Sequence, residues 1–204
     1  MRPYLVLSHA IKDGLDETDF QKSAMIYCPM VIQTERLYAR PWSLESDIDS
    51  VLDLYGHPEV VRFIGNRRIE TPEAAREYLQ LRINMTRELG GTLGFWALVL
   101  RATEEVIGNI LLKPLPGKNR VPTSHIEVGW HLTPSAWGQG YATEAGRAML
   151  LRAFSELGLE RVLAVAEPDN LGSIAVMRRL EMTPLGRTTD FYDGEILEQF
   201  ERRI

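Results

Sequence analysis

The stretch from His125 to Ala145 contains an alternating strand, a glycine-containing turn and the start of a helix in direct succession. Apolar side chains at the even positions of Ile126–Leu132 alternate with polar or small ones, which is the period of a half-buried strand. Gly138 and Gly140 stand in the turn, and the helix that follows is expected over 141–157. This strand–turn–helix unit is the most specific local signal in the chain.

Strand-like and helix-like segments interleave along the rest of the chain from residue 31 onward. Strands are expected at 36–40, 95–101, 106–112 and 161–166, helices at 43–55, 72–89 and 171–180, an exposed Pro- and Gly-containing link at 114–124, and a last hairpin with a type I′ turn at Asp193-Gly194. Ser43 is the expected N-cap of the first helix. The short links between the middle strands favour antiparallel pairing, so the fold class is predicted to be mixed α/β (α+β).

The first thirty residues differ from the remainder, because no period of 2 or 3.6 residues emerges in them. The 204 residues are therefore divided into an N-terminal extension over 1–30 and a single domain over 31–204. Cys28 is the only cysteine, so no intrachain disulfide is expected and a reducing compartment, the cytoplasm, is favoured. No apolar run approaches 18 residues, and no secretory signal is recognised.

The charge balance bears on partners rather than on the fold. The chain has 23 Lys and Arg against 28 Asp and Glu, a formal net charge of −5. A negative electrostatic field does not attract nucleic acid, and it is compatible with a cationic substrate. Neither a nucleic acid nor a membrane is expected as a partner.

The turn between strand and helix has the properties of an anion site. The first turn of a helix leaves N–H groups without partners, and the macrodipole adds positive charge there. Gly138 and Gly140 would let a ligand approach the backbone closely, which suits a pyrophosphate. Thr143 stands at the position where the dinucleotide-binding fingerprint has its third small residue, so the sequence does not match that fingerprint. A tight turn with glycines kept for packing remains the alternative.

One face of the strand carries a carboxylate and an imidazole separated by a bare glycine. Glu127 and His131 are four residues apart, about 13 Å along a strand, so they cannot touch directly. The gap over Gly129 can admit a substrate. A solvated polar face is the alternative interpretation.

Residues 137–145 (WGQGYATEA) resemble the acyl-CoA loop of the GNAT superfamily, most closely its Rim-type branch, which acetylates ribosomal-protein N-termini and other amines. Three more stretches agree in order and spacing, namely 34–41 (TERLYARP), 127–130 (EVGW) and 169–177 (DNLGSIAVM). The resemblance covers residues 31–204. It implies a GNAT-like fold with a central mixed, mostly antiparallel sheet, splayed between its fourth and fifth strands and flanked by helices.

The resemblance also implies where acetyl-CoA, the expected co-substrate, is held. The pantetheine arm is expected along the backbone of four strand residues, the pyrophosphate at the N–H groups of the turn and helix start, and Asn170 either steadies the arm or caps its helix. The implied cofactor residues are Gly129, Trp130, His131, Leu132, Trp137, Gly138, Gln139, Gly140, Tyr141, Ala142 and Asn170. No metal ligands are proposed.

The implied reaction is N-acetyl transfer from acetyl-CoA to a primary amine, a protein N-terminal α-amine or a small amine, by direct attack. Glu127 is the candidate base, a backbone N–H near Trp130 the oxyanion donor, and Ser173 the candidate acid for the leaving thiolate. Ser173 is chosen because the family's tyrosine is absent between Asn170 and Leu180. The alternative function is a non-catalytic acyl-CoA-binding sensor of the same fold.

Two further departures from the family pattern, and expectations for the N-terminus, the acceptor and the oligomeric state, accompany this resemblance. Trp137 replaces the usual Gln or Arg, and Glu181 replaces a glycine that follows the last helix, which costs about 1 kcal/mol if the backbone there is left-handed. Residues 30–37 (MVIQTERL) resemble a family start, so residues 1–29 are expected to be a mis-assigned start or a loosely held arm. The basic segment 56–71, with Arg62, suits an acidic feature in the acceptor. The oligomeric state is open, and a homodimer is kept as one expectation.

Overall fold

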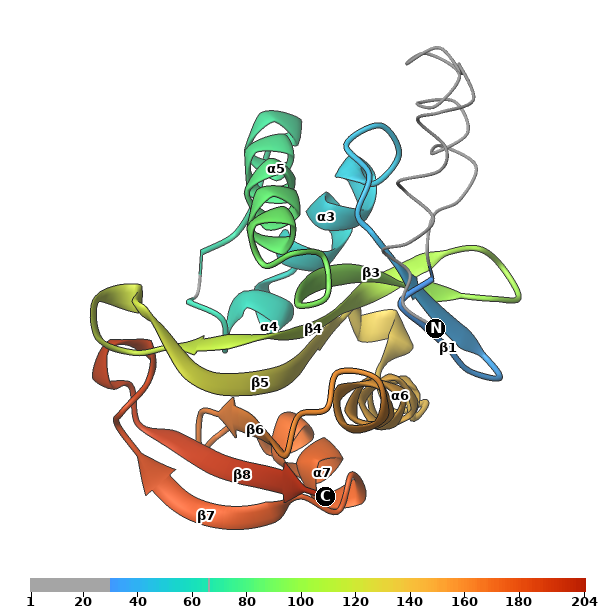
Figure 1. Ribbon diagram of the computed structural model, residues 1–204. Coiled ribbons are helices and arrows are strands. Elements are labelled where there is room, and N and C mark those ends of the chain that lie inside the picture. The colour runs from blue at the N-terminus through green and yellow to red at the C-terminus, as the bar shows by residue number, and fades with distance from the viewer. Residues whose placement is uncertain (1–29, 66) are drawn as a thin grey trace, which may run out of the picture.

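The computed structural model describes residues 30–65 and 67–204, and the expectations for residues 1–29, Cys28 among them, lie outside this part. Its centre is a single eight-stranded sheet in the order β1-β2-β3-β4-β5-β6-β8-β7 (Figure 1). The strands are β1 (Ile32–Gln33), β2 (Leu37–Arg40), β3 (Gly94–Leu100), β4 (Val106–Pro116), β5 (Pro122–Leu132), β6 (Arg161–Ala166), β7 (Thr183–Thr188) and β8 (Leu197–Arg203). The helices are α3 (Ile48–Tyr55), α4 (Pro58–Val61), α5 (Pro72–Glu88), α6 (Tyr141–Ser155) and α7 (Leu171–Arg179).

The sheet is antiparallel except at one junction. β5 and β6 run parallel, and Glu127 opposite Leu163 is the single register pair recorded between them. Beyond Glu127 the two strands diverge, so the last five residues of β5 pair only with β4 in the described chain. The predicted mixed α/β fold, with a mostly antiparallel sheet splayed between its fourth and fifth long strands, is confirmed.

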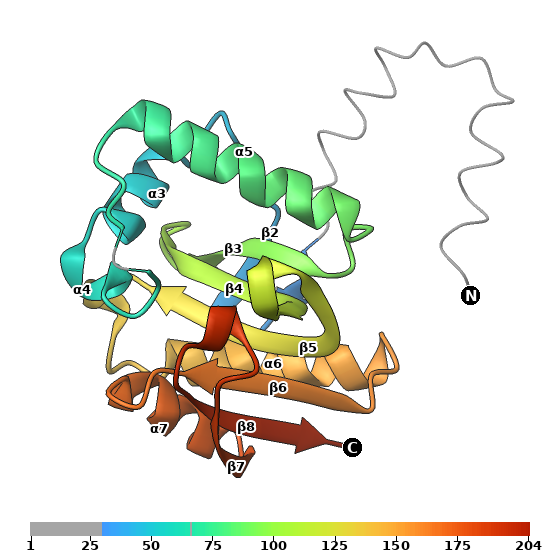
Figure 2. The same ribbon diagram turned by 90° about the vertical axis from the view of Figure 1, so that its left-hand side faces the viewer.

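Helices cover both faces of the sheet, and each face has its own apolar core. Phe95, Ala97 and Val99 of β3 point into the core under α3 and α5, whereas Trp96 and Leu98 point into the core under α6 and α7. This alternation is the period-2 pattern of a strand that is buried on both sides. Figures 1 and 2 show α3 and α5 on one side of the sheet and α6 on the other.

The first predicted helix begins later than Ser43. The carboxylate of Asp47 accepts hydrogen bonds from the backbone N–H of Ser43, at 2.8 Å, and from the Arg40 guanidinium, at 2.7 Å. These bonds hold residues 43–46 in a turn, and α3 begins at Ile48 with Asp47 as its N-cap residue. The expectation of Ser43 as the cap was therefore wrong. The short helix α4 was not predicted.

Two loops also differ from expectation. The β4–β5 ladder continues to Pro116 opposite Pro122, so the predicted link over 114–124 shrinks to the residues between these strands. The last hairpin is present, but residues 189–196 join its strands, and Asp193 has a positive φ of 62°. Gly194 also has a positive φ, of 91°, so both residues have the φ sign that the predicted turn requires, but they lie within a connection of eight residues rather than forming a two-residue loop. The Asp193 carboxylate binds Arg120, at 2.8 Å.

The backbone at Glu181 is left-handed, with φ of 55°, so the condition under which the replacement of a glycine carries a cost is met. Its carbonyl accepts a hydrogen bond of 2.7 Å from Arg202 on β8. Within the described ranges, no helix combines the length and the apolar character needed to cross a lipid bilayer.

Candidate functional site

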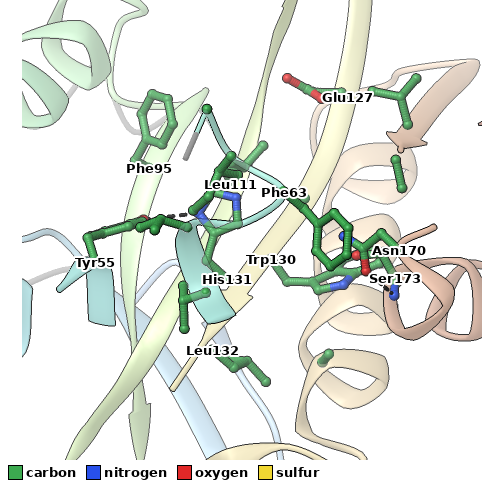
Figure 3. A pocket seen from close by; sticks show the side chains of 18 of the residues that line it. Tyr55, Phe63, Phe95, Leu111, Glu127, Trp130, His131, Leu132, Asn170 and Ser173 are labelled. Carbon is green, nitrogen blue, oxygen red and sulfur yellow. Dashed lines mark hydrogen bonds between the residues drawn. The ribbon is translucent and has the colours of Figure 1, made fainter. Parts of the chain in front are cut away.

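A single cleft of about 1580 Å³ follows the splay of the sheet. One wall comes from α4, α5 and the segment between them, and the other from α7 and the start of α6. The last six residues of β5 line the floor (Figure 3). All the predicted site residues except Gln139 line this cleft.

The end of β5 offers backbone groups without a strand partner. Gly129, Trp130, His131 and Leu132 pair with β4 on one side, and no register pair to β6 is recorded for them. Gly129 lies opposite Leu111, whose side chain would be 3.0 Å from an added Cβ. An extended ligand can therefore add to this edge in the manner of a strand.

The turn before α6 depends on the backbone freedom of its two glycines. Gly138 and Gly140 have φ values of 74° and 81°, which L side chains rarely adopt. α6 begins at Tyr141 without a side-chain cap, so its first N–H groups are left for a ligand. The buried hydroxyl of Thr143 has no hydrogen-bond partner within the described residues and lines the same cleft.

Side chains from the β1–β2 connection brace this turn. The Glu144 carboxylate accepts hydrogen bonds of 2.6 Å from Thr34 and 2.7 Å from Arg36. Arg36 also donates to the carbonyl of Gln139, at 3.1 Å, and stacks on Tyr141 at 4.6 Å. The Gln139 side chain folds back onto the Ser135 carbonyl, so only its backbone remains a candidate ligand.

Trp137 anchors the turn to the end of β5. Its indole N–H donates a hydrogen bond of 2.8 Å to the carbonyl of Leu132, the last residue of β5. The remaining surface of the Trp137 ring is exposed at the cleft. The bond fixes the anion-binding turn relative to the free strand edge.

Asn170 and Ser173 lie together at the start of α7. The Asn170 side-chain oxygen accepts a hydrogen bond of 3.1 Å from the Ser173 backbone N–H, so the capping interaction is formed. Neither the amide nitrogen of Asn170 nor the hydroxyl of Ser173 forms a hydrogen bond within the part of the chain that the structure describes, and both residues line the cleft. Figure 3 shows this pair set apart from Glu127.

Glu127 is buried, with 4% of its surface exposed, although it lines the cleft. Lys113, its register partner on β4, binds its Oε1 atom, and the phenol of Tyr192 donates a hydrogen bond of 2.5 Å to that same oxygen. No described residue donates a hydrogen bond to Oε2. One carboxylate oxygen is thus held by the protein, and the other is left for a ligand.

Tyr192, which binds Glu127, and His131, which lies on the same strand as Glu127, are a poor acid and a poor base at neutral pH. Burial and the adjacent Glu127 carboxylate raise the pKa of Tyr192, so the phenol keeps its proton and acts as a donor. Desolvation, with Arg82 and Lys113 nearby, lowers the pKa of His131 to about 3. Neutral His131 pairs through Nδ1 with the Tyr55 hydroxyl at 3.0 Å (Figure 3).

Lys113 and Tyr192 were missed at the level of sequence. Strand register could have found Lys113, because an antiparallel hairpin of 106–112 and 125–132 extends to place residue 113 opposite residue 127. No local signal identifies Tyr192, which reaches Glu127 only through the long β7–β8 loop.

Comparisons with known proteins agree with this geometry. Residues 36–183 match the family model described as an acetyltransferase (GNAT) domain. The chain is 28% identical over 160 residues to an uncharacterized N-acetyltransferase, p20, of Bacillus licheniformis, covering 78% of this chain and 86% of that protein. It is 31% identical over 157 residues to the FsC-acetyl coenzyme A-N(2)-transacetylase of Aspergillus fumigatus, covering 76% of this chain and 62% of that protein.

Among solved structures, the fold is similar to that of RimL, a ribosomal L7/L12 α-N-protein acetyltransferase in complex with coenzyme A. The TM-score is 0.69 at 17% identity, and the match covers 86% of this chain and 98% of that one. At this identity the similarity concerns the fold.

Proposed function

This chain belongs to the acetyltransferase (GNAT) family, whose members transfer an acetyl group from acetyl-CoA to amines, and we propose that its cleft carries out this transfer onto a primary amine beside Glu127. The acceptor is a protein N-terminal α-amine, as in RimL, or a small-molecule amine. One observation carries the proposal: a free strand edge, an uncapped helix start and a buried carboxylate line one continuous cleft.

The residues around the splay suit acetyl-CoA as co-substrate. The backbone of Gly129–Leu132 would hydrogen-bond the pantetheine arm, and the Asn170 amide would steady it from α7. The N–H groups from Trp137 to Ala142, without a side-chain cap at the start of α6, would hold the pyrophosphate. The unpartnered Thr143 hydroxyl supports this position, because a bound phosphate oxygen would satisfy it.

Glu127 acts as the base in this proposal. Presenting a neutral amine at pH 7 costs about 1 kcal/mol for an α-amine and about 4.6 kcal/mol for a lysine. A carboxylate base, acting directly or through one water, can deprotonate an α-amine at the smaller of these two costs, which favours an α-amine over a lysine as the acceptor. Oε2 is the oxygen that would take the proton, since Lys113 and Tyr192 both bind Oε1.

The remaining steps need a donor for the oxyanion and a proton for the thiolate. The backbone N–H near Trp130, on the free edge of β5, would donate to the developing oxyanion. The Ser173 hydroxyl, on the first turn of α7 and facing the cleft, would protonate the leaving thiolate. The protons balance if the amine gives its proton to Glu127, Ser173 gives its proton to the thiolate, and the Ser173 oxygen then regains the proton held by Glu127 through water in the cleft.

The experiment is a thiol-release assay with acetyl-CoA and a panel of peptides, polyamines and aminoglycosides. We expect release of one thiol per acetylated amine with at least one class of acceptor. Silence across the panel while acetyl-CoA binds tightly would overturn the proposal in favour of the acyl-CoA sensor.

A further inference from the structure

Arg82 of α5 lies in the acceptor half of the cleft with its guanidinium held between two aromatic rings. Its Cζ atom is 4.6 Å from the centroid of Tyr78 and 4.5 Å from that of Phe95, and all three residues line the cleft. Cation–π contact with both rings restrains the guanidinium, and no hydrogen bond is formed by its Nη2 atom within the described residues, so this atom is free to bind a ligand.

The guanidinium lacks a carboxylate partner within the described ranges. Its Nε atom is buried with no hydrogen-bond partner there, and Nη1 donates only to the Met85 sulfur, at 3.6 Å. Three other cations that line the cleft are paired, Lys113 with Glu127, Arg68 with Glu70 and Arg120 with Asp193. Arg62 and Arg67 also line the cleft and have no ion pair within the described residues, but both are exposed to solvent. A buried charged donor without an acceptor is unfavourable, so an anion from a ligand would satisfy it.

Arg82 is also connected by packing contacts to the end of the cleft that contains Glu127. Tyr78 packs on Tyr55, with ring centroids 4.7 Å apart, and Tyr55 binds His131 on β5. The Nζ atom of Lys113, which pairs with Glu127, lies 6.0 Å from the centroid of the same Phe95 ring that Arg82 contacts. One acceptor molecule can therefore reach both the guanidinium and the free Glu127 oxygen.

We propose that the acceptor is an amine that also carries a carboxylate, and that Arg82 binds this carboxylate while the amine lies at Glu127. This inference rests on the proposed acetyl transfer and names its substrate class. The carboxylate belongs either to a small amino-acid-like amine or to an acidic residue next to the N-terminus of a peptide. A planar guanidinium binds a carboxylate with two parallel hydrogen bonds, which gives preference over a neutral amide of equal size.

The test compares acceptors that differ only in this group. Peptides with Glu or Gln at the second position form one arm, and small amines bearing a carboxylate or the matching primary amide form the other. We expect kcat/KM to favour the acidic member by tenfold or more in one arm, mainly through KM, and that arm identifies the source of the carboxylate. Equal kcat/KM for acid and amide in both arms would overturn the inference while leaving acetyl transfer intact.

Substitutions of Arg82 assign the preference to this residue. Arg82→Met should bring the acid-to-amide ratio close to one, and Arg82→Lys should restore part of it by returning the charge. Arg87→Met is the matched control, because Arg87 lies exposed on the same helix outside the cleft, and its ratio should equal that of the wild type. Acetyl-CoA binding checks that each variant is folded. A ratio that survives Arg82→Met would contradict the assignment, and a wild type that acetylates no amine would remove the proposed function and this inference together.

Discussion

The phenol of Tyr192 donates a hydrogen bond of 2.5 Å to Oε1 of Glu127 from a position 65 residues further along the chain. The β7–β8 loop carries Tyr192 across the cleft, and Asp193 of that loop is bound by Arg120 from the β4–β5 turn. Lys113 occupies the same Glu127 oxygen. Two loops and one strand thus fix the direction in which the other carboxylate oxygen points.

Tyr192→Phe tests whether this bond positions the base. Hydrogen bonds to charged groups contribute about 1.5–3 kcal/mol, so we expect kcat/KM to fall at least about tenfold. Acetyl-CoA affinity should not change, because the phenol lies at Glu127 rather than at the α6 turn. The measurement is steady-state kinetics with titration of acetyl-CoA.

Tyr38→Phe is the control for that substitution. The Tyr38 phenol also donates a 2.5 Å hydrogen bond to a glutamate, Glu104, but on an exposed part of the sheet away from the cleft. Its kinetics should match the wild type. An equal loss in both variants would mean that the effect of Tyr192→Phe is not specific to Glu127.

Lys113→Met should destabilise the protein. Removing one partner of a buried ion pair leaves an uncompensated charge and costs about 3–5 kcal/mol. Urea unfolding of the variant and of the wild type measures this loss of stability.

The double variant Lys113→Met with Glu127→Gln supplies the control, because it removes both charges. We expect it to recover most of the stability lost in Lys113→Met while remaining inactive. A double variant no more stable than Lys113→Met alone would show that the lysine acts by packing and not by charge.

Gly140→Glu should weaken acetyl-CoA binding at least about a hundredfold. The substitution adds a negative charge at the N-terminal end of α6, where the pyrophosphate is proposed, and strains a backbone with φ of 81°. Gly158→Glu is the matched control, since Gly158 has φ of 65°, lies just past the other end of α6 and does not line the cleft. Calorimetric titration should find wild-type affinity in the control; weakened binding in both variants would contradict the assigned phosphate position.

His131 should make stability fall on acidification. Its pKa is about 3 in the folded protein against 6.5 ordinarily, so below pH 6.5 the unfolded chain binds a proton that the folded protein does not. The contribution of His131 to the free energy of unfolding is complete above pH 6.5. It decreases as the pH falls toward 3, by up to about 1.4 kcal/mol per pH unit. Urea unfolding between pH 7 and pH 4.5 should show a shallower slope for His131→Asn, and equal slopes would contradict the assignment.

The hydrophobic periodicity of each segment predicted most of the helices and strands, because a 2-residue or 3.6-residue period is visible within the segment itself. The strand Arg161–Ala166 and the start of α6 at Tyr141 agree with the structure to the residue. The start of α3 was missed because of Asp47, which lies three residues beyond the predicted helix start. Its carboxylate binds the Arg40 guanidinium and the Ser43 backbone N–H, and it forms no side-chain capping bond to the helix. An ion pair between side chains seven residues apart leaves no period in the sequence.

The candidate site was predicted where it lies on one continuous segment and missed where it is assembled from distant ones. Gly138, Gly140 and the face of Glu127 follow from residues 125–145 alone. Tyr192 and Arg82 reach the cleft only through packing of the last hairpin and of α5, and neither carries a local motif. The roles of the named site residues, cytoplasmic location and a homodimer stay predictions.

The most direct test of the account is the turnover of Glu127→Gln with a peptide α-amine and saturating acetyl-CoA. The variant keeps the size and hydrogen-bonding shape of the side chain but cannot take a proton, so its kcat should fall by about 10²–10⁴-fold. Acetyl-CoA affinity should stay at the wild-type value, because the anion site lies at α6. Wild-type turnover in Glu127→Gln would contradict the central claim that this buried carboxylate is the base.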